Sequence, residues 1–256
     1  MGVKTNISLK KANSLFDGFS FKKLSPTTSG IMDTTYFADN FILKKYERDV
    51  DVKRDIKLLQ TLKNKNLNVP TCKAQNHPFY LYDKLNGSHV KSVKLFHIIS
   101  LVRFLKEFHN ADIETTNYNN IIDKEEINLL LNYTKKHFFY YKKFLFLKNH
   151  NSHVDGVIHG DIFKDNVLFD KHQVKVFDFI DSAKGSFLFD LAVILVGFGV
   201  DKSKYYKNIS LKVYNQNNNK KYNLKGLENE IKSARAFYAL KRIQKHKNTK
   251  KAKELL

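Results

Sequence analysis

The segment from Val157 to Asp190 constrains the fold more than any other part of the chain. It reads VIHGDIFKDNVLFDKHQVKVFDFIDSAKGSFLFD. Three short apolar runs, at residues 157–158, 167–169 and 174–177, alternate with polar turns, and this pattern predicts short β-strands. The polar residues therefore fall on loops between strands, where a rigid scaffold can present their side chains to a ligand.

The polar side chains of this segment follow an order that suits phosphoryl transfer. His159, Gly160 and Asp161 form one turn, Asn166 follows five residues later, and Asp178 comes after the next apolar run. Such transfer needs one carboxylate near an acceptor hydroxyl, and a carboxamide and a second carboxylate that hold Mg²⁺ on nucleotide phosphates. Asp and Asn are also ordinary turn formers. However, four residue types at fixed offsets should arise by chance in only about one chain in a thousand.

At these positions the sequence resembles the aminoglycoside-phosphotransferase-like kinases, a branch of the protein-kinase fold. The matching residues are the loop His159–Asn166, the step Phe177-Asp178-Phe179 and the helix start Asp190-Leu191-Ala192. The surrounding sequence is most similar to the homoserine kinases of that family. The resemblance implies an α+β, two-lobed protein-kinase-like fold. A small N-lobe with an antiparallel sheet would cover residues 1–86, and a mainly helical C-lobe would cover residues 87–256.

The order of elements expected from the residue patterns fits this fold. Apolar spacing and turn residues predict a short helix after Ser8, strands at 19–24, 31–38 and 41–46, a helix at 52–62, and strands near 71–74 and 79–82. From residue 92 onward the pattern is helical, with long helices expected over 125–148 and 227–246.

The resemblance also assigns roles in the catalytic loop and its supports. Asp161 would be the catalytic carboxylate, and Asn166 and Asp178 would bind Mg²⁺ on ATP. His159 and Asp190 would support the loop through hydrogen bonds. Asp181 follows Asp178 by three residues. It could face an ammonium group of the acceptor, or it could be a solvated loop acid.

A second set of residues would bind the nucleotide. Lys44 lies on the strand expected at 41–46 and would contact the phosphates, while Lys45 would point to the opposite face because strand side chains alternate. A shift of one residue would exchange the two. The acid that pairs with this lysine would be Asp55 on the following helix, with Asp51 and Glu47 as rival partners.

The remaining nucleotide contacts are expected at two loops. The first precedes the strand of Lys44, and there Gly30 would allow close backbone approach while Thr34 and Thr35 would donate hydroxyl hydrogen bonds. The second is a hinge after the last strand of the N-lobe, with Asp83 and Leu85 as contacts.

The composition agrees with a globular protein. The net charge of +20 would suit nucleic acid or an anionic membrane. The lysines are spread along the whole chain, however, so a solvated surface is the favoured interpretation and a nucleic-acid partner is not expected. The longest apolar run, 187–200, is too short to span a bilayer. The single cysteine, Cys72, suits a reducing compartment, and the expected location is cytoplasmic.

The interval between Asp178 and Asp190 has no room for a long peptide-docking loop. The expected acceptor is therefore a small molecule with a hydroxyl group. Homoserine is the first choice by resemblance, and another amino alcohol, an aminoglycoside or a sugar is the alternative. A second alternative is a non-catalytic, basic kinase-fold protein that binds nucleic acid or anionic membrane. The presence of Lys44, Asp161, Asn166 and Asp178 together favours an active enzyme. The pattern specifies no oligomeric state.

Overall fold

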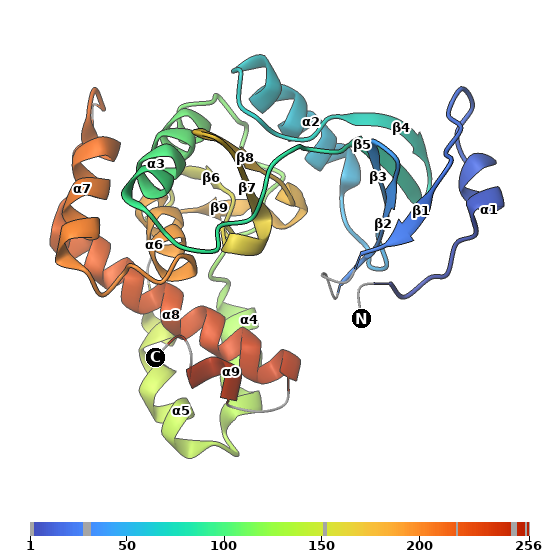
Figure 1. Ribbon diagram of the computed structural model, residues 1–256. Helices are drawn as coiled ribbons and strands as arrows, with labels where there is room; N and C mark the ends of the chain where they lie inside the picture. The colour runs from blue at the N-terminus through green and yellow to red at the C-terminus, as the bar shows by residue number, and fades with distance from the viewer. Residues whose placement is uncertain are drawn as a thin grey trace. The chain divides into compact units, whose positions relative to one another are not determined.

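The computed structural model describes residues 3–27, 32–150, 153–218, 220–246, 250–253 and 255. These residues form two compact units, drawn in Figure 1. The first unit comprises Met1–Gly87 together with Lys175–Ile180, and the second comprises Ser88–Val174 together with Asp181–Leu256. The division expected from the sequence placed residues 175–180 with the second unit. In the structure this short segment, which carries Asp178, belongs to the first.

The first unit is built on a five-stranded antiparallel sheet in the order β1-β2-β3-β5-β4. Its strands are β1 (Leu24–Pro26), β2 (Thr34–Ala38), β3 (Phe41–Lys45), β4 (Cys72–Asn76) and β5 (Phe79–Asp83). Asp39 has a φ of 52° at the turn between β2 and β3, and its carboxylate accepts the backbone N–H groups of Lys22 and Lys23. In this hairpin Thr35 lies opposite Lys44, which fixes the register of the lysine strand.

The strand expected at 19–24 is wrong except at its last residue. The aromatic side chains of this stretch instead form a cluster in which Phe19 packs edge-on against Phe41, with ring centroids 5.4 Å apart. Asn13, at the end of helix α1 (Leu9–Asn13), exchanges two hydrogen bonds with the backbone of Phe21. The alternating apolar pattern was therefore produced by core packing of a loop and not by strand pairing.

Helix α2 (Val52–Asn64) begins at Asp51, whose carboxylate accepts the N–H of Arg54 at 2.9 Å. Its apolar face is buried, with Ile56, Leu59 and Leu62 at most 8% exposed. The guanidinium of Arg54 donates to the carbonyl of Ile180 at 2.9 Å. The helix is thus tied to the segment that carries Asp178, within the same unit.

The second unit is mainly helical. Its helices are α3 (Leu95–His109), α4 (Lys124–Thr134), α5 (Phe138–Phe144), α6 (Phe187–Gly197), α7 (Lys204–Asn215), α8 (Leu224–His246) and α9 (Lys250–Lys253). Short strands β6 (Gly156–Ile158) and β9 (Ala183–Gly185) pair with each other, and β7 (Val167–Asp170) pairs with β8 (Gln173–Val176). The 3-10 turns are η1 (Leu145–Asn149), η2 (Lys164–Asn166) and η3 (Phe179–Asp181).

Helix α6 forms the centre of this unit. Every residue from Leu188 to Val196 is buried, which explains the apolar run seen in the sequence. Helix α8 packs along α6 and also contacts α4 and α9, which Figure 1 shows beside it. In the part of the chain that the structure describes, no helix combines the length and apolarity needed to cross a membrane.

The single helix expected over 125–148 is wrong, because the segment is divided into α4, α5 and η1. At the first break the Thr134 hydroxyl donates to the carbonyl of Leu131, and the N–H of His137 donates to the carbonyl of Thr134 at 2.8 Å. These local bonds close a turn in place of a further helical turn.

Candidate active site

The loop from His159 to Asn166 joins strand β6 to η2 in the second unit. Its conformation is fixed by internal hydrogen bonds. The N–H of Phe163 donates to the carbonyl of Asp161 at 2.8 Å, and the N–H of Asp161 donates to His159 Nδ1 at 3.2 Å. His159 is fully buried, whereas Asp161 is half-buried. The loop therefore hides its histidine and leaves the Asp161 carboxylate within reach of a ligand.

Asn166 is bonded directly to Asp161. Its amide nitrogen donates to the Asp161 carbonyl at 2.8 Å and to Asp161 Oδ2 at 2.9 Å. These bonds orient the carboxylate and assign the NH₂ end of the carboxamide to Asp161. The carbonyl end, Oδ1, is then the atom of Asn166 that can bind a cation.

A buried carboxylate, that of Asp190, holds the backbone of this loop. Asp190, in the first turn of α6, accepts the N–H groups of His159 at 2.8 Å and Gly160 at 2.9 Å, and lies 3.2 Å from His109 Nε2. Burial would raise the pKa of Asp190, but its bond with His109 holds the pKa below its usual value. Asp190 is therefore an ion whose charge is balanced by donors, as expected for a fully buried acid.

His109 is itself held on both sides. The Tyr214 hydroxyl lies 2.7 Å from its Nδ1, and the ring of Phe187 stacks on it with centroids 4.0 Å apart. Burial lowers the pKa of His109 overall, although Asp190 opposes this shift. A neutral imidazole that accepts from Tyr214 and donates to Asp190 satisfies every contact.

Gly160 meets a second requirement of the loop. Its φ is +75°, and a Cβ atom there would lie 2.7 Å from the Ile121 side chain. Glycine is the residue that adopts this conformation without steric penalty.

In the first unit, Lys44 contacts Asp178. Its ammonium lies 2.7 Å from Asp178 Oδ1 and 3.8 Å from Asp33 Oδ2. Burial would lower the pKa of Lys44, but Asp178, with smaller contributions from Asp33 and Asp55, raises it overall. Asp178 has a φ of 68°, an uncommon left-handed conformation for a residue other than glycine. Lys45, by contrast, bonds Glu47 and Thr5 and does not share this contact.

Asp55 does not form an ion pair with Lys44 within 4.0 Å among the described residues. It is 3% exposed, and its Oδ1 has no hydrogen-bond partner in the described part of the chain. Burial raises the pKa of Asp55 to about 7, although Lys44 opposes the shift. The rival acids also differ from expectation, since Asp51 caps α2 and Glu47 bonds Lys45.

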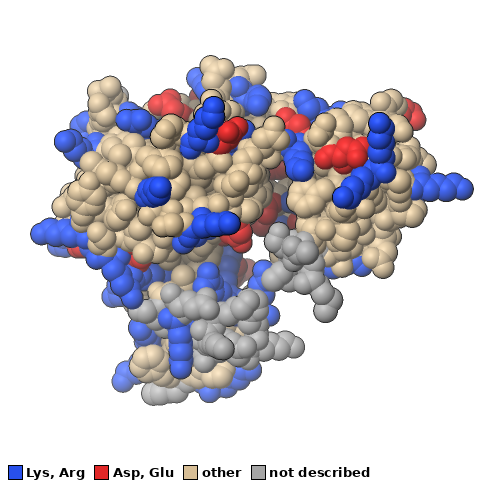
Figure 2. Space-filling view, in the orientation of Figure 1, with Lys and Arg blue, Asp and Glu red and all other residues tan. Residues whose placement is uncertain are grey.

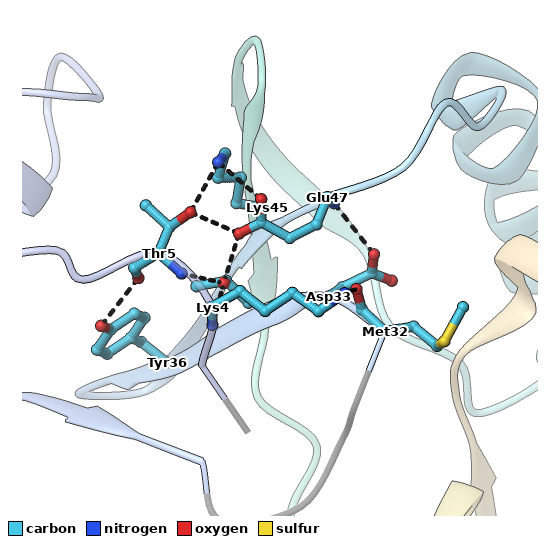
Figure 3. Close-up of polar contacts among 8 residues, drawn as sticks. Lys4, Thr5, Met32, Asp33, Tyr36, Lys45 and Glu47 are labelled. Carbon is cyan, nitrogen blue, oxygen red and sulfur yellow. Dashed lines mark hydrogen bonds and ion pairs between the residues drawn. The ribbon is translucent and has the colours of Figure 1, made fainter. Parts of the chain in front are cut away.

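The segment expected to be a loop that contacts the nucleotide leads into strand β2, whose first two residues are Thr34 and Thr35. Gly30 lies outside the described residues. The Thr34 hydroxyl is buried, donates to Glu47 Oε1 at 2.6 Å, and accepts the N–H groups of Lys4 and Thr5 at 2.9 Å each. Figure 3 shows this network around Glu47. The hydroxyl of Thr34 is thus engaged within the protein, whereas Thr35 is half-buried and its carbonyl accepts from Thr27.

The expected hinge residues lie at and after the end of β5. The Asp83 carboxylate accepts the N–H of Thr71, so this side chain holds the start of the β4 strand. Leu85 lies in the following loop and is half-buried.

Three residues of these networks were missed by sequence reasoning. Asp33, 3.8 Å from Lys44, lies near the start of the strand expected at 31–38 and was given no role. His109 follows the apolar stripe of α3, a position where a buried polar residue could have been suspected. Tyr214 carries no local signal, because its partner His109 is distant in sequence.

The residues expected to bind a metal offer oxygen atoms, which suit a hard cation such as Mg²⁺. Within the described residues, no group of three or more His, Cys, Asp and Glu side chains could hold a metal ion alone. Mg²⁺ typically takes few protein ligands and keeps waters and substrate phosphates as the others. The donor set therefore fits an ion that arrives with a nucleotide.

Residues 23–208 match the family described as "Phosphotransferase enzyme family" (APH). The chain belongs to this family. A curated relative, homoserine kinase of Neisseria meningitidis serogroup B, is 54% identical over 39 residues. That match covers 15% of this chain and only 13% of the relative's length.

Solved structures agree on the fold. The gentamicin complex of APH(2")-IIa has a TM-score of 0.72 at 18% identity, covering 98% of this chain and 94% of that one. The amicoumacin kinase hAmiN, in complex with AMP-PNP, Ca²⁺ and Ami, has a TM-score of 0.71 at 14% identity, covering 93% and 85%. The expected α+β kinase-like fold, with an antiparallel N-terminal sheet and a helical C-terminal part, is confirmed.

Proposed function

We propose that this phosphotransferase transfers the γ-phosphoryl group of ATP to the hydroxyl of homoserine and releases ADP and O-phosphohomoserine. The observation that carries the proposal is the Asp161 carboxylate, oriented by Asn166 at 2.9 Å on a loop anchored to Asp190. The short match with a homoserine kinase supports the choice of acceptor. The AMP-PNP and Ca²⁺ in the hAmiN structure support a nucleotide with a divalent cation.

In this reaction Asp161 accepts a hydrogen bond from the acceptor hydroxyl and aims its oxygen at the γ-phosphorus. The new oxygen–phosphorus bond forms as the bond to the β-phosphate oxygen breaks, and the hydroxyl proton passes to Asp161 late in transfer. Positioning accounts for most of the rate enhancement in such reactions. The hydrogen bonds that fix Asp161 therefore contribute directly to the rate.

The other residues bind the nucleotide. Asn166 Oδ1 and the Asp178 carboxylate would hold Mg²⁺, which neutralises phosphate charge when bound. The Lys44 ammonium would contact the phosphates, as a point charge can in a partly dry site. Both sets of residues must act on one nucleotide for transfer to occur.

The test is phosphorylation of homoserine with MgATP, followed by mass spectrometry of the product. Asp161→Asn should lower kcat by about 10² to 10⁴, because a positioned acid–base group contributes that factor. Its affinity for MgATP, measured by calorimetry, should stay close to that of the wild type. Transfer to gentamicin or another aminoglycoside, but not to homoserine, would show that the proposed acceptor is wrong. Undiminished transfer by Asp161→Asn would show that Asp161 is not the catalytic carboxylate.

A further inference from the structure

The end of helix α8 borders the catalytic loop in the second unit. The ring of Phe163, two residues after Asp161, meets the ring of Tyr238 at 4.9 Å between centroids and 73° between planes. One turn further along α8, the Arg242 guanidinium carbon lies 6.0 Å from the centre of the same Phe163 ring. The N–H of Phe163 donates to the Asp161 carbonyl, so these contacts place Arg242 beside the loop that carries the proposed catalytic carboxylate.

Charges of both signs surround this end of α8. The buried Tyr238 hydroxyl feels the carboxylates of Asp161, Asp181 and Glu126, which add to the effect of burial in raising its pKa. Glu126, on α4, forms an ion pair with Lys241 at 3.2 Å. Asp181 is exposed at the start of the segment that leads to β9. The Arg242 guanidinium therefore lies on α8 near the catalytic loop, and the carboxylates of Asp161 and Asp181 lie close enough to act on the neighbouring Tyr238.

We propose that Arg242 binds a carboxylate of the acceptor and thereby makes this site specific for hydroxylated amino acids. The proposal rests on the proposed function and names the residue that selects the substrate class. A guanidinium binds a carboxylate through two parallel hydrogen bonds, and its contact with an aromatic face fixes the plane of the fork. Asp181 supplies a charge that suits the ammonium group of the same acceptor.

The alternative acceptor class fits this surface poorly. An aminoglycoside carries several ammonium groups and no carboxylate, so it would bring further cations to the Arg242 guanidinium and offer it no anionic partner. Placing like charges together disfavours the wrong partner as effectively as good contacts favour the right one. Because Lys241 is paired with Glu126, Arg242 is the cation of these two that argues for an acceptor with an acidic group.

Three acceptors separate the contributions of the two charged groups. Homoserine carries both, 4-hydroxybutyrate lacks the ammonium, and 3-aminopropan-1-ol lacks the carboxylate. Arg242→Gln should raise KM for homoserine and 4-hydroxybutyrate by about 30-fold or more, because the acceptor carboxylate loses its charged partner. It should leave kcat/KM for 3-aminopropan-1-ol and KM for MgATP unchanged. Arg242→Lys should restore part of the loss, since it keeps the charge but not the fork.

Lys232→Gln is the matched control, because it removes the same charge from the same helix at an exposed position over the Phe146 ring. It should change none of these constants. An equal loss for all three acceptors in Arg242→Gln would overturn the proposal, since it would indicate a structural role. Transfer by the wild type that is faster to 3-aminopropan-1-ol than to homoserine would overturn it as well.

Calorimetry of acceptor binding separates this inference from the proposed function. Titration of homoserine into the protein with AMP-PNP and Mg²⁺ requires no transfer. Binding that weakens in Arg242→Gln but not in Lys232→Gln supports the inference even if no product forms, in which case the proposed function fails alone. Homoserine binding that is absent, or identical in the wild type and Arg242→Gln, overturns the role of Arg242.

Discussion

At the scale of single residues, Asp190 connects the buried core to the catalytic loop. It is fully buried, and it accepts two backbone N–H groups of that loop while His109 lies beside it. His109 is bonded to Asp190, and Tyr214 is bonded to His109. Their expected contribution is therefore the orientation of Asp190, and through it the position of Asp161.

Asp190→Asn should lower the free energy of unfolding by about 3 kcal/mol, because hydrogen bonds to a charged group contribute roughly 1.5–3 kcal/mol each. The pKa of Asp190 is held below its usual value of 3.8, so its stabilisation is complete above that pH and is lost as pH falls through the lower value. Urea titrations at several pH values would measure this. A difference between wild type and variant that grows below pH 4 would contradict it.

Glu230 should have the opposite pH dependence. Burial raises its pKa to about 7 from a usual value of 4.5, and His150, 3.6 Å away, has its own pKa lowered by burial and so offers little charge in return. The stabilisation is complete below 4.5 and is lost as pH rises through about 7.

Glu230→Gln should consequently be more stable than the wild type at pH 8, by up to about 3 kcal/mol from the size of the shift. Thermal unfolding at pH 5 and pH 8 measures the change. Glu228→Gln removes an exposed acid of the same helix that is paired with Lys207, and this variant should gain no stability at pH 8. Equal stability of wild type and Glu230→Gln at pH 8 would show that Glu230 is not buried as described.

Individual residues differ in how far the sequence alone could assign them. The spacing of His159, Asp161, Asn166 and Asp178 was informative because each residue type is demanded by the proposed chemistry. Asp33 and Tyr214 carry no such pattern, since their importance depends on partners brought close only by folding. Thr34 shows the converse, because a hydroxyl in the expected loop is bonded to Glu47.

At the scale of elements, helix α2 depends on its first residue. The Asp51 carboxylate accepts the N–H of Arg54, and Arg54 in turn holds the segment of Ile180. Asp51→Ala should lower the free energy of unfolding by about 1 kcal/mol, the usual effect of losing a helix cap. Lys53→Ala, at an exposed position in the first turn, should change stability by less than about 0.5 kcal/mol. Equal effects of the two variants in urea titrations would contradict the capping role.

Elements with strong periodicity or turn signals were predictable, and those shaped by tertiary contacts were not. The β2–β3 hairpin and helix α2 have these signals, and their observed bounds lie close to the expected ranges. The alternation of Phe19 and Phe21 suggested a strand. The same alternation arises when side chains of a loop pack into a core without strand pairing, so the pattern could not separate the two cases. The break after Thr134 was missed because hydroxyl-to-backbone bonds leave no distinct pattern in a single sequence.

At the scale of the whole molecule, binding of MgATP should raise the free energy of unfolding. If both sets of residues act on one nucleotide, MgATP at a hundred times its Kd should stabilise the protein by about 2.7 kcal/mol. Thermal unfolding with and without MgATP measures this. Asp161→Asn should retain the shift, whereas Lys44→Met and Asp178→Ala should reduce it. A full shift in all three variants would contradict the proposed nucleotide contacts.

The surface charge is a property of the whole chain. Figure 2 shows Lys and Arg side chains scattered over the visible face, with no single patch that gathers them. The lysines are also spread along the whole sequence, so binding to plain DNA should be weak and should disappear between about 50 and 200 mM salt, as counterion release requires. Retained submicromolar binding at 200 mM salt, measured by fluorescence anisotropy, would instead favour a dedicated polyanion site.

The ion pair between Lys44 and Asp178 has a consequence for how ligands enter. The lysine is proposed to contact the phosphates and the aspartate the metal, so either ligand arriving alone must separate two charges now 2.7 Å apart. When nucleotide and metal bind together, the free energy of separating Lys44 from Asp178 is spent once, while both the phosphate contact and the metal contact form. Nucleotide and Mg²⁺ should therefore each strengthen the binding of the other by the same factor, a reciprocal coupling that originates in the protein and adds to their attraction in solution.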